Sequence, residues 1–365
     1  MTQDITALQQ EHGNFFTPAY RILVDSKDLL TNYYMEIANV QVDNTLKGAD
    51  RFSFTVNSTF NFEKREFDHL RDTFAFGKPV EIYMGYASNL HLKLMLRGII
   101  TSVQTSFPAS GLPQINVSGY DLSYPMSKGK KSDNWSDRTD TDVVKIVAAR
   151  YGLATNVDDT KVKHPKTEQS QESDMQLLEK LAERNGFEMY VYDKTLYFRV
   201  PQNSVPAIVT LEWGKGLVSF APEINLSEQI SKVEVRGWDI QKKTEILGVA
   251  QRGDEPGREP GRRSGAEQLK SIVKDDEAGS LKIRVPVFSK QEAEQRAKAI
   301  LKKRSEMFVQ GSGESIGLPE IMADTNVELK GLGAMFSKTY YIDQTTHTVS
   351  SSGYKTSFKV KDTTI

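Results

Sequence analysis

The sequence contains no cysteine among its 365 residues. It therefore has no disulfide, no thiolate nucleophile and no cysteine-ligated metal. It also lacks any apolar run approaching the roughly 20 residues needed to span a bilayer. The polar N-terminal stretch has no apolar core of the kind that a signal peptide needs. We expect a chain that is made and folded in the cytoplasm, without membrane insertion.

An excess of charge of either sign is also missing. The 47 basic and 48 acidic residues give a net charge of −1, whereas nucleic-acid binders usually carry a strong basic excess. We therefore predict no specific nucleic-acid binding. Hydrophobic residues make up 38% of the chain and charged residues 26%, which is typical of a folded protein. The length favours about two or three domains.

Alternation of apolar and polar residues predicts strands at both ends of the chain. In the run DRFSFTVNS, Phe52, Phe54 and Val56 share one face at a period of two. Glycine, proline, asparagine and aspartate separate this run from its neighbours, as turns require. The first such region covers about 110 residues and predicts a barrel or a sandwich.

Helix signals concentrate between these two regions. The stretch SDMQLLEKLAERNGFEMYVYDKTLYF, residues 173–198, predicts a helix followed by two strands. Ser173 and Gln176 have the spacing of a capping box, and Gly186 favours a helix stop. A second capping box at Ser289 and Glu292 predicts another helix further along the chain.

The two β regions resemble each other. PVEIYMG, GIITSVQTSF and QINVSGYD in the first correspond to NVELKGL, YYIDQTTHTVS and YKTSFKVKD near the C-terminus. The similarity predicts two copies of one β-domain on either side of a helical module. The predicted organisation is an N-terminal arm at 1–14, a first β-domain at 15–125, an α/β module at 126–205, and a second β-domain at 206–365 with a loop at about 241–280 and a helix at 289–307 inserted.

One short motif has the pattern of a catalytic serine. GESIG at 313–317 matches the nucleophile elbow G-x-S-x-G, and Ser315, Asp324 and His347 follow in the chain order of an α/β-hydrolase triad. The elbow requires a helix after the serine, but Pro319 and a segment without helical period follow it. We therefore predict no triad here.

No other motif in the sequence indicates metal binding, phosphate binding or catalysis. The five histidines, at positions 12, 69, 91, 164 and 347, are too widely spaced for a zinc motif. No glycine-rich segment stands between a strand and a helix as phosphate binding requires. We predict no metal, no cofactor and no enzymatic activity. The α/β module does carry acids, and a cell-wall hydrolase acting through Glu172, Asp174 and Glu183 remains an alternative.

The order of these parts resembles a known family. The chain is similar to the phage late control D proteins, which are hubs of contractile tails related to phage baseplate hubs and to the N-terminal part of VgrG proteins. The family's signature motif and its closing strands fall on these residues of the present sequence: Glu172, Ser173, Asp174, Leu178, Leu181, Ala182, Gly186, Phe187, Leu196, Phe198, His347, Gly353, Tyr354, Thr356 and Phe358.

The resemblance implies an α+β fold in which two antiparallel β-barrel domains, similar to tail-tube subunits, flank a small α/β module. It implies a homotrimer in a baseplate, with a hexameric inner tube docked on one side and a trimeric spike on the other, beside other baseplate components. The chain ends at Ile365 without an OB-domain or a β-helix, so we expect the spike to be a separate chain. The alternative is a tube or terminator protein without spike contact.

Overall fold

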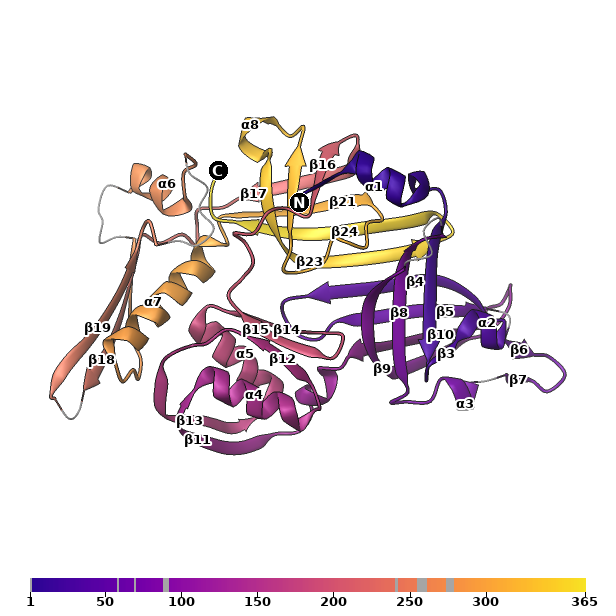
Figure 1. Ribbon diagram of the computed structural model, residues 1–365, viewed down its shortest axis with the longest axis horizontal. Helices are drawn as coiled ribbons and strands as arrows, with labels where there is room; N and C mark the ends of the chain where they lie inside the picture. The colour runs from indigo at the N-terminus through magenta and orange to yellow at the C-terminus, as the bar shows by residue number, and fades with distance from the viewer. Residues whose placement is uncertain are drawn as a thin grey trace.

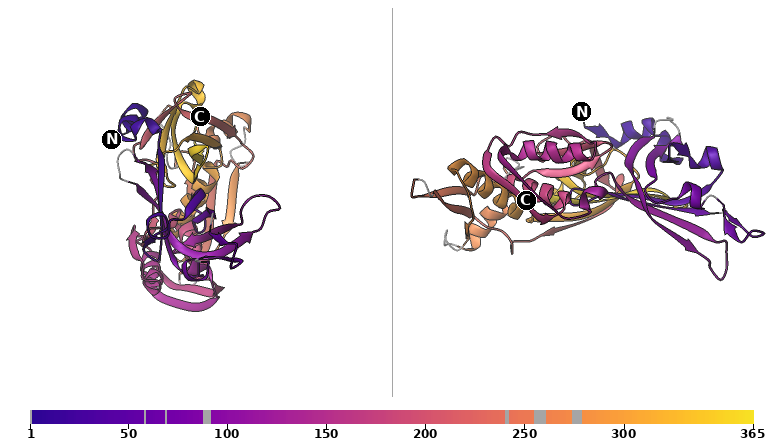
Figure 2. Two further views of the ribbon diagram at one scale, coloured as in Figure 1. Left: turned by 90° about the vertical axis from the view of Figure 1, so that its right-hand side faces the viewer. Right: turned by 90° about the horizontal axis from the view of Figure 1, so that it is seen from below.

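The computed structural model of the chain describes residues 2–57, 59–68, 70–87, 92–239, 242–254, 261–273 and 279–365. The molecule is elongated, with the first β-domain at one end and a unit inserted into the second β-domain at the other (Figures 1 and 2). Buried apolar side chains form four clusters in the described residues, one for each β-domain, one for the α/β module and one for the inserted unit.

The first β-domain is an open barrel. Its sheet follows the order β4 (Glu36–Thr45), β5 (Arg51–Asn57), β10 (Gln114–Asp121), β9 (Lys93–Ser106), β8 (Pro79–Tyr86) and β2 (Pro18–Val24). Within the described residues no ladder joins β2 to β4, but the Tyr20 hydroxyl donates to the Ile37 carbonyl at 2.6 Å. The connections contain β3 (Lys27–Asp28), α2 (Leu29–Tyr33), β6 (Phe60–Asn61), β7 (Glu66–Phe67) and α3 (Leu70–Thr73).

The second β-domain is a closed barrel of six strands. Around it run β16 (Val209–Trp213), β17 (Gly216–Ile224), β21 (Val309–Ile316), β24 (Gly353–Asp362), β23 (Lys338–Ser350) and β22 (Asn326–Lys330), which pairs back to β16. The short helix α8 (Gly333–Phe336) follows β22. The α+β fold with tube-like β-domains that the sequence predicted is confirmed.

The N-terminal residues fold back onto the second β-domain instead of forming a free arm. β1 (Gln3–Asp4) pairs with β16, and α1 (Ile5–Glu11) buries Ile5 and Leu8 in that domain's core. A 3₁₀ turn (Gly13–Phe15) then leads to β2. The two buried side chains lie three residues apart, which is the spacing of one helix face. This spacing is the sequence signal for the short helix α1.

Five strands of one β-domain correspond to five strands of the other. In chain order β4, β5, β8, β9 and β10 match β17, β21, β22, β23 and β24, and the same neighbours pair in both domains. The sixth strands differ, because β2 is antiparallel to β8 while β16 is parallel to β22. The internal similarity inferred from the sequence is therefore present in the strand pairing.

The two β-domains share one continuous sheet. β23 pairs antiparallel with β4, from Gln344 opposite Thr45 to Val349 opposite Val40. In Figure 1 these two strands run side by side where the domains meet. Backbone hydrogen bonds, rather than a flexible linker, therefore fix the relative position of the two domains.

The α/β module consists of two helices and two small sheets. Its elements are a 3₁₀ turn (Tyr124–Ser127), β11 (Lys131–Thr139), α4 (Asp140–Arg150), β12 (Ala154–Val157), β13 (Lys163–Glu172), α5 (Asp174–Asn185), β14 (Glu188–Tyr192) and β15 (Thr195–Arg199). The capping box at α5 is present, and Gly186 ends the helix with a φ of 68°. Leu177, Leu178 and Leu181 are buried in the module's core.

The inserted unit lies between β17 and β21. It contains β18 (Lys232–Asp239), β19 (Thr244–Gln251), α6 (Gly265–Ile272), β20 (Ser280–Arg284) and α7 (Lys290–Ser305). The segment 241–280, which the sequence predicted to be a loop, thus holds the strand β19 and the helix α6 in its described part, and β20 begins at its end. None of the helices in the described residues is both long and apolar enough to cross a membrane.

The start of α7 departs from the predicted capping box. The Ser289 hydroxyl accepts from the backbone N–H of Glu292 as expected. The Glu292 carboxylate, however, accepts from the N–H of Phe288 at 2.8 Å. It also faces the α/β module, which explains why this side chain does not complete the local box.

The cap of α5 can be tested directly. Replacing Ser173 with alanine leaves the N–H of Gln176 without its acceptor, so we expect a loss of about 1 kcal/mol in the free energy of unfolding. Urea unfolding monitored by circular dichroism measures this loss. Ser204→Ala, at an exposed loop serine, is the matched control and should change stability by less than half as much.

Candidate functional site

The polar residues of the signature motif form a buried structural network. The fully buried carboxylate of Asp174 accepts from Lys131 at 2.5 Å, from the Tyr151 hydroxyl at 2.7 Å and from the Gln169 amide at 2.9 Å. Arg150 adds a fourth contact at 3.2 Å. Burial raises the pKa of Asp174, but the hydrogen bonds outweigh it and hold the pKa below the ordinary value. The carboxylate is thus ionised and fully engaged.

Glu172 and Glu183, the other acids of the hydrolase alternative, do not converge with Asp174. Glu172 is paired with Lys180 at 3.0 Å, and the exposed Glu183 is paired with Lys303 at 2.5 Å. Each of the three carboxylates therefore has its own cation, and these three acids do not share a site as acid–base catalysis through them would require.

A second buried network joins the α/β module to the inserted unit. Asp140, at the start of α4, accepts from the Arg184 side chain at 2.9 Å and from the Asn185 amide at 2.7 Å. His164 lies between Asp140, at 3.5 Å, and Glu292 of α7, at 3.4 Å. Burial lowers the pKa of His164, but the two carboxylates outweigh burial and raise it. His164 therefore lies between one acid from each unit, and its raised pKa favours the protonated form.

A third cluster holds α7, the module and the second β-domain together. Lys302 of α7 donates to the Gly186 carbonyl at 2.9 Å and lies 3.3 Å from Glu188. Lys361 of β24 lies 3.4 Å from the same Glu188 and 3.1 Å from both Glu306 and Asp343. These charges line a cleft of about 1070 Å³. Because these lysines and carboxylates come from the inserted unit, the module and the second β-domain, the ion pairs cross-link the three units.

The module is also tied to both β-domains. Arg97 of β9 contacts Asp193 at 2.5 Å, and the Tyr192 hydroxyl donates to the Leu94 carbonyl at 2.8 Å. On the other side, Arg199 contacts Asp324 at 2.7 Å, and Asp324 also accepts from the Tyr190 and Tyr341 hydroxyls. The module therefore braces the two halves of the shared sheet from one side.

The residues of the hydrolase hypothesis do not form a triad. Ser315 lies within β21, where its hydroxyl donates to the Ile316 carbonyl at 2.9 Å. Asp324 is bound by Arg199 and two tyrosines, as described above. His347 contacts neither of them, because its Nε2 donates to the Ile321 carbonyl at 2.8 Å and its Nδ1 accepts from Tyr354 at 2.9 Å. The prediction of no triad agrees with this geometry.

His347, Gly353 and Tyr354 of the signature lie together at the hairpin of β23 and β24. Gly353 has a φ of 110°, which only glycine adopts without strain. Tyr354 covers Gly317, where an added Cβ would lie 2.0 Å from the ring. Burial lowers the pKa of His347 to about 4. The neutral imidazole therefore serves as a fixed hydrogen-bonding link between β23 and the 316–322 segment.

Among the residues that the structure describes, no group of three or more histidine and acidic side chains is arranged so that it could hold a metal ion. His12 pairs with Glu320 at 3.0 Å, and His164 and His347 have the partners given above. His69 and His91 lie outside the described residues.

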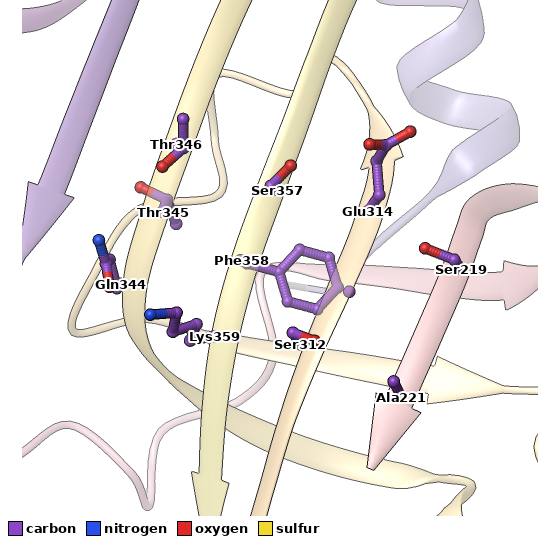
Figure 3. A pocket seen from close by; sticks show the side chains of 11 residues that line it. Ser219, Ala221, Ser312, Glu314, Gln344, Thr345, Thr346, Ser357, Phe358 and Lys359 are labelled. Atoms are coloured by element: carbon purple, nitrogen blue, oxygen red, sulfur yellow. The ribbon is translucent and has the colours of Figure 1, made fainter.

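The solvent-facing side of the shared sheet carries polar side chains, most of them small, and the charged Glu314 and Lys359. Figure 3 shows this face over β17, β21, β24 and β23, with Ser219, Ser312, Ser357 and Thr346 side by side around a shallow depression of about 290 Å³. The same face continues across the joint into β4 and β5, through Asp43 and its neighbours. Both apolar cores lie on the opposite face.

The family model for the Alg8 N-terminal domain matches residues 17–351. The chain belongs to this family. Its curated relatives include the probable baseplate hub protein of Escherichia phage P2, which is 27% identical over 203 residues, covering 54% of this chain and 49% of that protein. The chain thus spans about half the length of the curated relatives it matches. The resemblance to baseplate hub proteins that the sequence predicted is confirmed.

Solved structures share the fold of this Alg8 N-terminal domain protein. The 43 kDa tail protein of prophage MuSo2 from Shewanella oneidensis superimposes with a TM-score of 0.70 at 14% identity, covering 95% of this chain and 100% of that one. A chain of the Francisella PdpA–VgrG complex superimposes with a TM-score of 0.56 at 12% identity, covering 98% of this chain and 60% of that one. The architecture of phage-tail and VgrG-complex proteins thus extends over nearly the whole chain.

Sequence reasoning found the signature residues but missed most of the polar ties. Ser173, Asp174, Gly186 and His347 occur where motif spacing placed them, and the structure gives each a structural contact. Lys302, Lys361 and Glu188 carried no local signal, because they are far apart in sequence.

The Asp174 network predicts a difference between two variants that share Arg150. Asp174→Asn keeps the side-chain shape but removes the buried charge, so we expect unfolding free energy to fall by about 2 kcal/mol. Asp133 contacts the same Arg150 at 2.7 Å from an exposed position. Asp133→Asn should therefore cost less than about 0.5 kcal/mol. Equal losses in urea unfolding would contradict this account.

The pKa of His347 predicts a pH dependence. A folded pKa of about 4 lies below that of an unfolded histidine, so the unfolded chain binds the extra proton and this contribution to stability falls as pH drops from 6.5 toward 4. The stability advantage of the native protein over His347→Gln should shrink by about 2 kcal/mol between pH 7 and pH 5. Urea unfolding of both proteins at both pH values measures it, and a constant difference would refute it.

Proposed function

We propose that this protein is the hub of a contractile-tail or injection-system baseplate. In this role it is a structural, non-enzymatic protein that forms a homotrimer and connects a hexameric inner tube to a trimeric spike carried by another chain. Its curated relatives, the probable baseplate hub proteins of two Escherichia phages, support a role in the baseplate. The buried, fully paired state of its signature acids supports a structural rather than a catalytic use of the α/β module.

The observation that carries the proposal is the duplicated β-domain. One chain holds two β-domains with five equivalent strands, joined edge to edge through β23 and β4. Three such chains around a threefold axis present six similar domains, which is the symmetry that a hexameric tube requires. The α/β module and the inserted unit occur once per chain, so they keep the threefold symmetry that a trimeric spike requires.

The polar face of the shared sheet supports the same arrangement. Since both apolar cores lie on one side of the sheet, a ring closed through the sheet edges turns the other side toward its axis. That side carries serine, threonine and glutamine side chains together with the charged Glu314 and Lys359 (Figure 3). A channel wall of polar and charged groups stays hydrated and exposes no apolar patch to material that passes through it.

Size measurements test the trimer. Light scattering on the purified protein should give the mass of three chains of 41.1 kDa each. A well-behaved monomer at micromolar concentration would count against the proposal.

Binding measurements test the partners. We expect the trimer to form a 3:3 complex with the spike protein encoded beside it and, independently, to bind the end of inner-tube assemblies. Binding to the tube without binding to the spike would identify a tube or terminator protein. Release of cell-wall fragments that disappears in Asp174→Asn would identify a hydrolase.

A further inference from the structure

In the joint between the two β-domains, the edges of β23 are occupied by three different strands. One edge of β23 carries β24, and the opposite edge carries first β22, at residues 338–341, and then β4, at residues 344–349. Facing side chains complement each other, since the Thr346 hydroxyl donates to Asp43 at 2.7 Å. On the core side of the sheet the joint buries Val40, Val42 and Val349.

The equivalent edges on the other two strands are open. β9 corresponds to β23, and it pairs with β8 only as far as Ile99. From Ser102 to Ser106 it has β10 on one side and, in the described residues, no strand on the other. β17 corresponds to β4, and it meets β16 only at Gly216 and Leu217, so that its edge from 218 to 224 has no strand within the described residues.

A shared bulge sets the correspondence residue by residue. β9 and β10 skip one residue of β9, Thr101, between the pairs Ile100–Gly119 and Ser102–Ser118. β23 and β24 skip Asp343 at the same place. Counting from the bulge, Gln104 corresponds to Thr346. β4 pairs with β5, and β17 pairs with β21. The registers of these two pairs make Glu223 correspond to Asp43.

We propose that the open edge of β9 in one copy of the chain pairs antiparallel with the open edge of β17 in a second copy. The register places Gln104 opposite Glu223 and Val103 opposite Ile224, and it repeats between chains the joint that β23 and β4 make within one chain. This inference rests on the proposed hub function, and it assigns the surface through which the ring closes.

The side chains at these edges fit the assigned register. Gln104 supplies an amide donor and Glu223 a carboxylate acceptor, as Thr346 and Asp43 do in the internal joint. On the core side, Val103 and Ile224 take the place of the buried pair Thr345 and Asn44. The isolated chain leaves Ile224 36% exposed. Val103 is partly buried against the core of its own domain, so covering Ile224 and the rest of Val103 in the ring favours association.

Phe107 extends the apolar part of the same edge. It directly follows β9, corresponds to the buried Val349 and is 63% exposed. Its ring also contacts those of Phe60 and Phe67, at centroid distances of 5.6 and 5.4 Å. The position opposite it in the assigned register is Phe220, the counterpart of Val40. An aromatic contact between copies therefore lies at the end of the ladder.

Pro222 is the one residue that weakens the pairing. It occupies the position of Val42 and has no N–H, so at most one hydrogen bond is missing from the ladder between chains. Its carbonyl still accepts. A proline on an edge strand also hinders pairing with unrelated strands. Pro222 therefore protects this edge from aggregation before the chains assemble.

Engineered disulfides test the register in a chain that has no cysteine of its own. The Leu46 N–H points at the Asp343 carbonyl, so strand alternation makes Thr346 and Asp43, and by correspondence Gln104 and Glu223, a non-hydrogen-bonded pair with close Cβ atoms. Gln104→Cys combined with Glu223→Cys should give covalent dimers and trimers on non-reducing gels, reversed by reductant. Asp43→Cys with Thr346→Cys is the positive control within one chain.

An off-register pair is the matched negative control. Ser102→Cys with Ala221→Cys places both thiols on the same two edges but four residues out of register, so we expect no covalent trimer. Cross-linking in this control as strong as in the test pair would overturn the register. A trimer by light scattering without cross-linking in the test pair would overturn the inference and leave the hub proposal standing. A chain that stays monomeric overturns both.

A substitution without cysteine gives an independent readout. Ile224→Asp places a charge in the covered part of the assigned interface, so the trimer's dissociation should become easier by about tenfold or more. Leu247→Asp is the control, because Leu247 is 37% exposed on β19, away from both edges. Mass photometry over a dilution series compares them, and circular dichroism checks that both variants stay folded. Equal effects on assembly would contradict the assignment.

Discussion

The antiparallel ladder between β23 and β4 is the interaction on which the rest of the structure depends. It turns two β-domains of one chain into a single curved sheet with both cores on one side. Backbone hydrogen bonds are directional, so the ladder fixes an angle as well as a contact. Because this angle is fixed, the duplicated strands, the polar face and the open edges of β9 and β17 have defined positions relative to one another.

Buried charges supply the remaining rigidity. The α/β module touches β9 through Asp193, the second β-domain through Arg199, and α7 through His164. In the last two ties the carboxylate, Asp324 or Glu292, is buried and would be costly to leave unpaired. A sheet braced in this way resists bending about the joint, as the proposed hub role requires.

Local signals made part of this architecture predictable from sequence. The capping box at Ser173, the stop at Gly186 and the repeated V-E strands depend on residues a few positions apart, and the structure has all of them. The pairing of β1 with β16, the pairing of β19 within 241–280 with β18, and the cluster around Lys361 depend on distant partners. No pattern within a short window encodes such partners, so the sequence predicted an arm and a loop and did not single out the residues of the cluster.

The inserted unit affects how a partner could be oriented about the axis of the proposed ring. It enters between β17 and β21, where the first β-domain has only the short turn between β4 and β5. In a ring of six similar β-domains, a turn of 60° would bring equivalent surfaces onto each other and leave two docking positions alike. A bulky unit on every second domain removes that ambiguity. In the proposed ring, a threefold partner that contacts the inserted unit would therefore have one distinct docking orientation, however closely the two β-domains resemble each other.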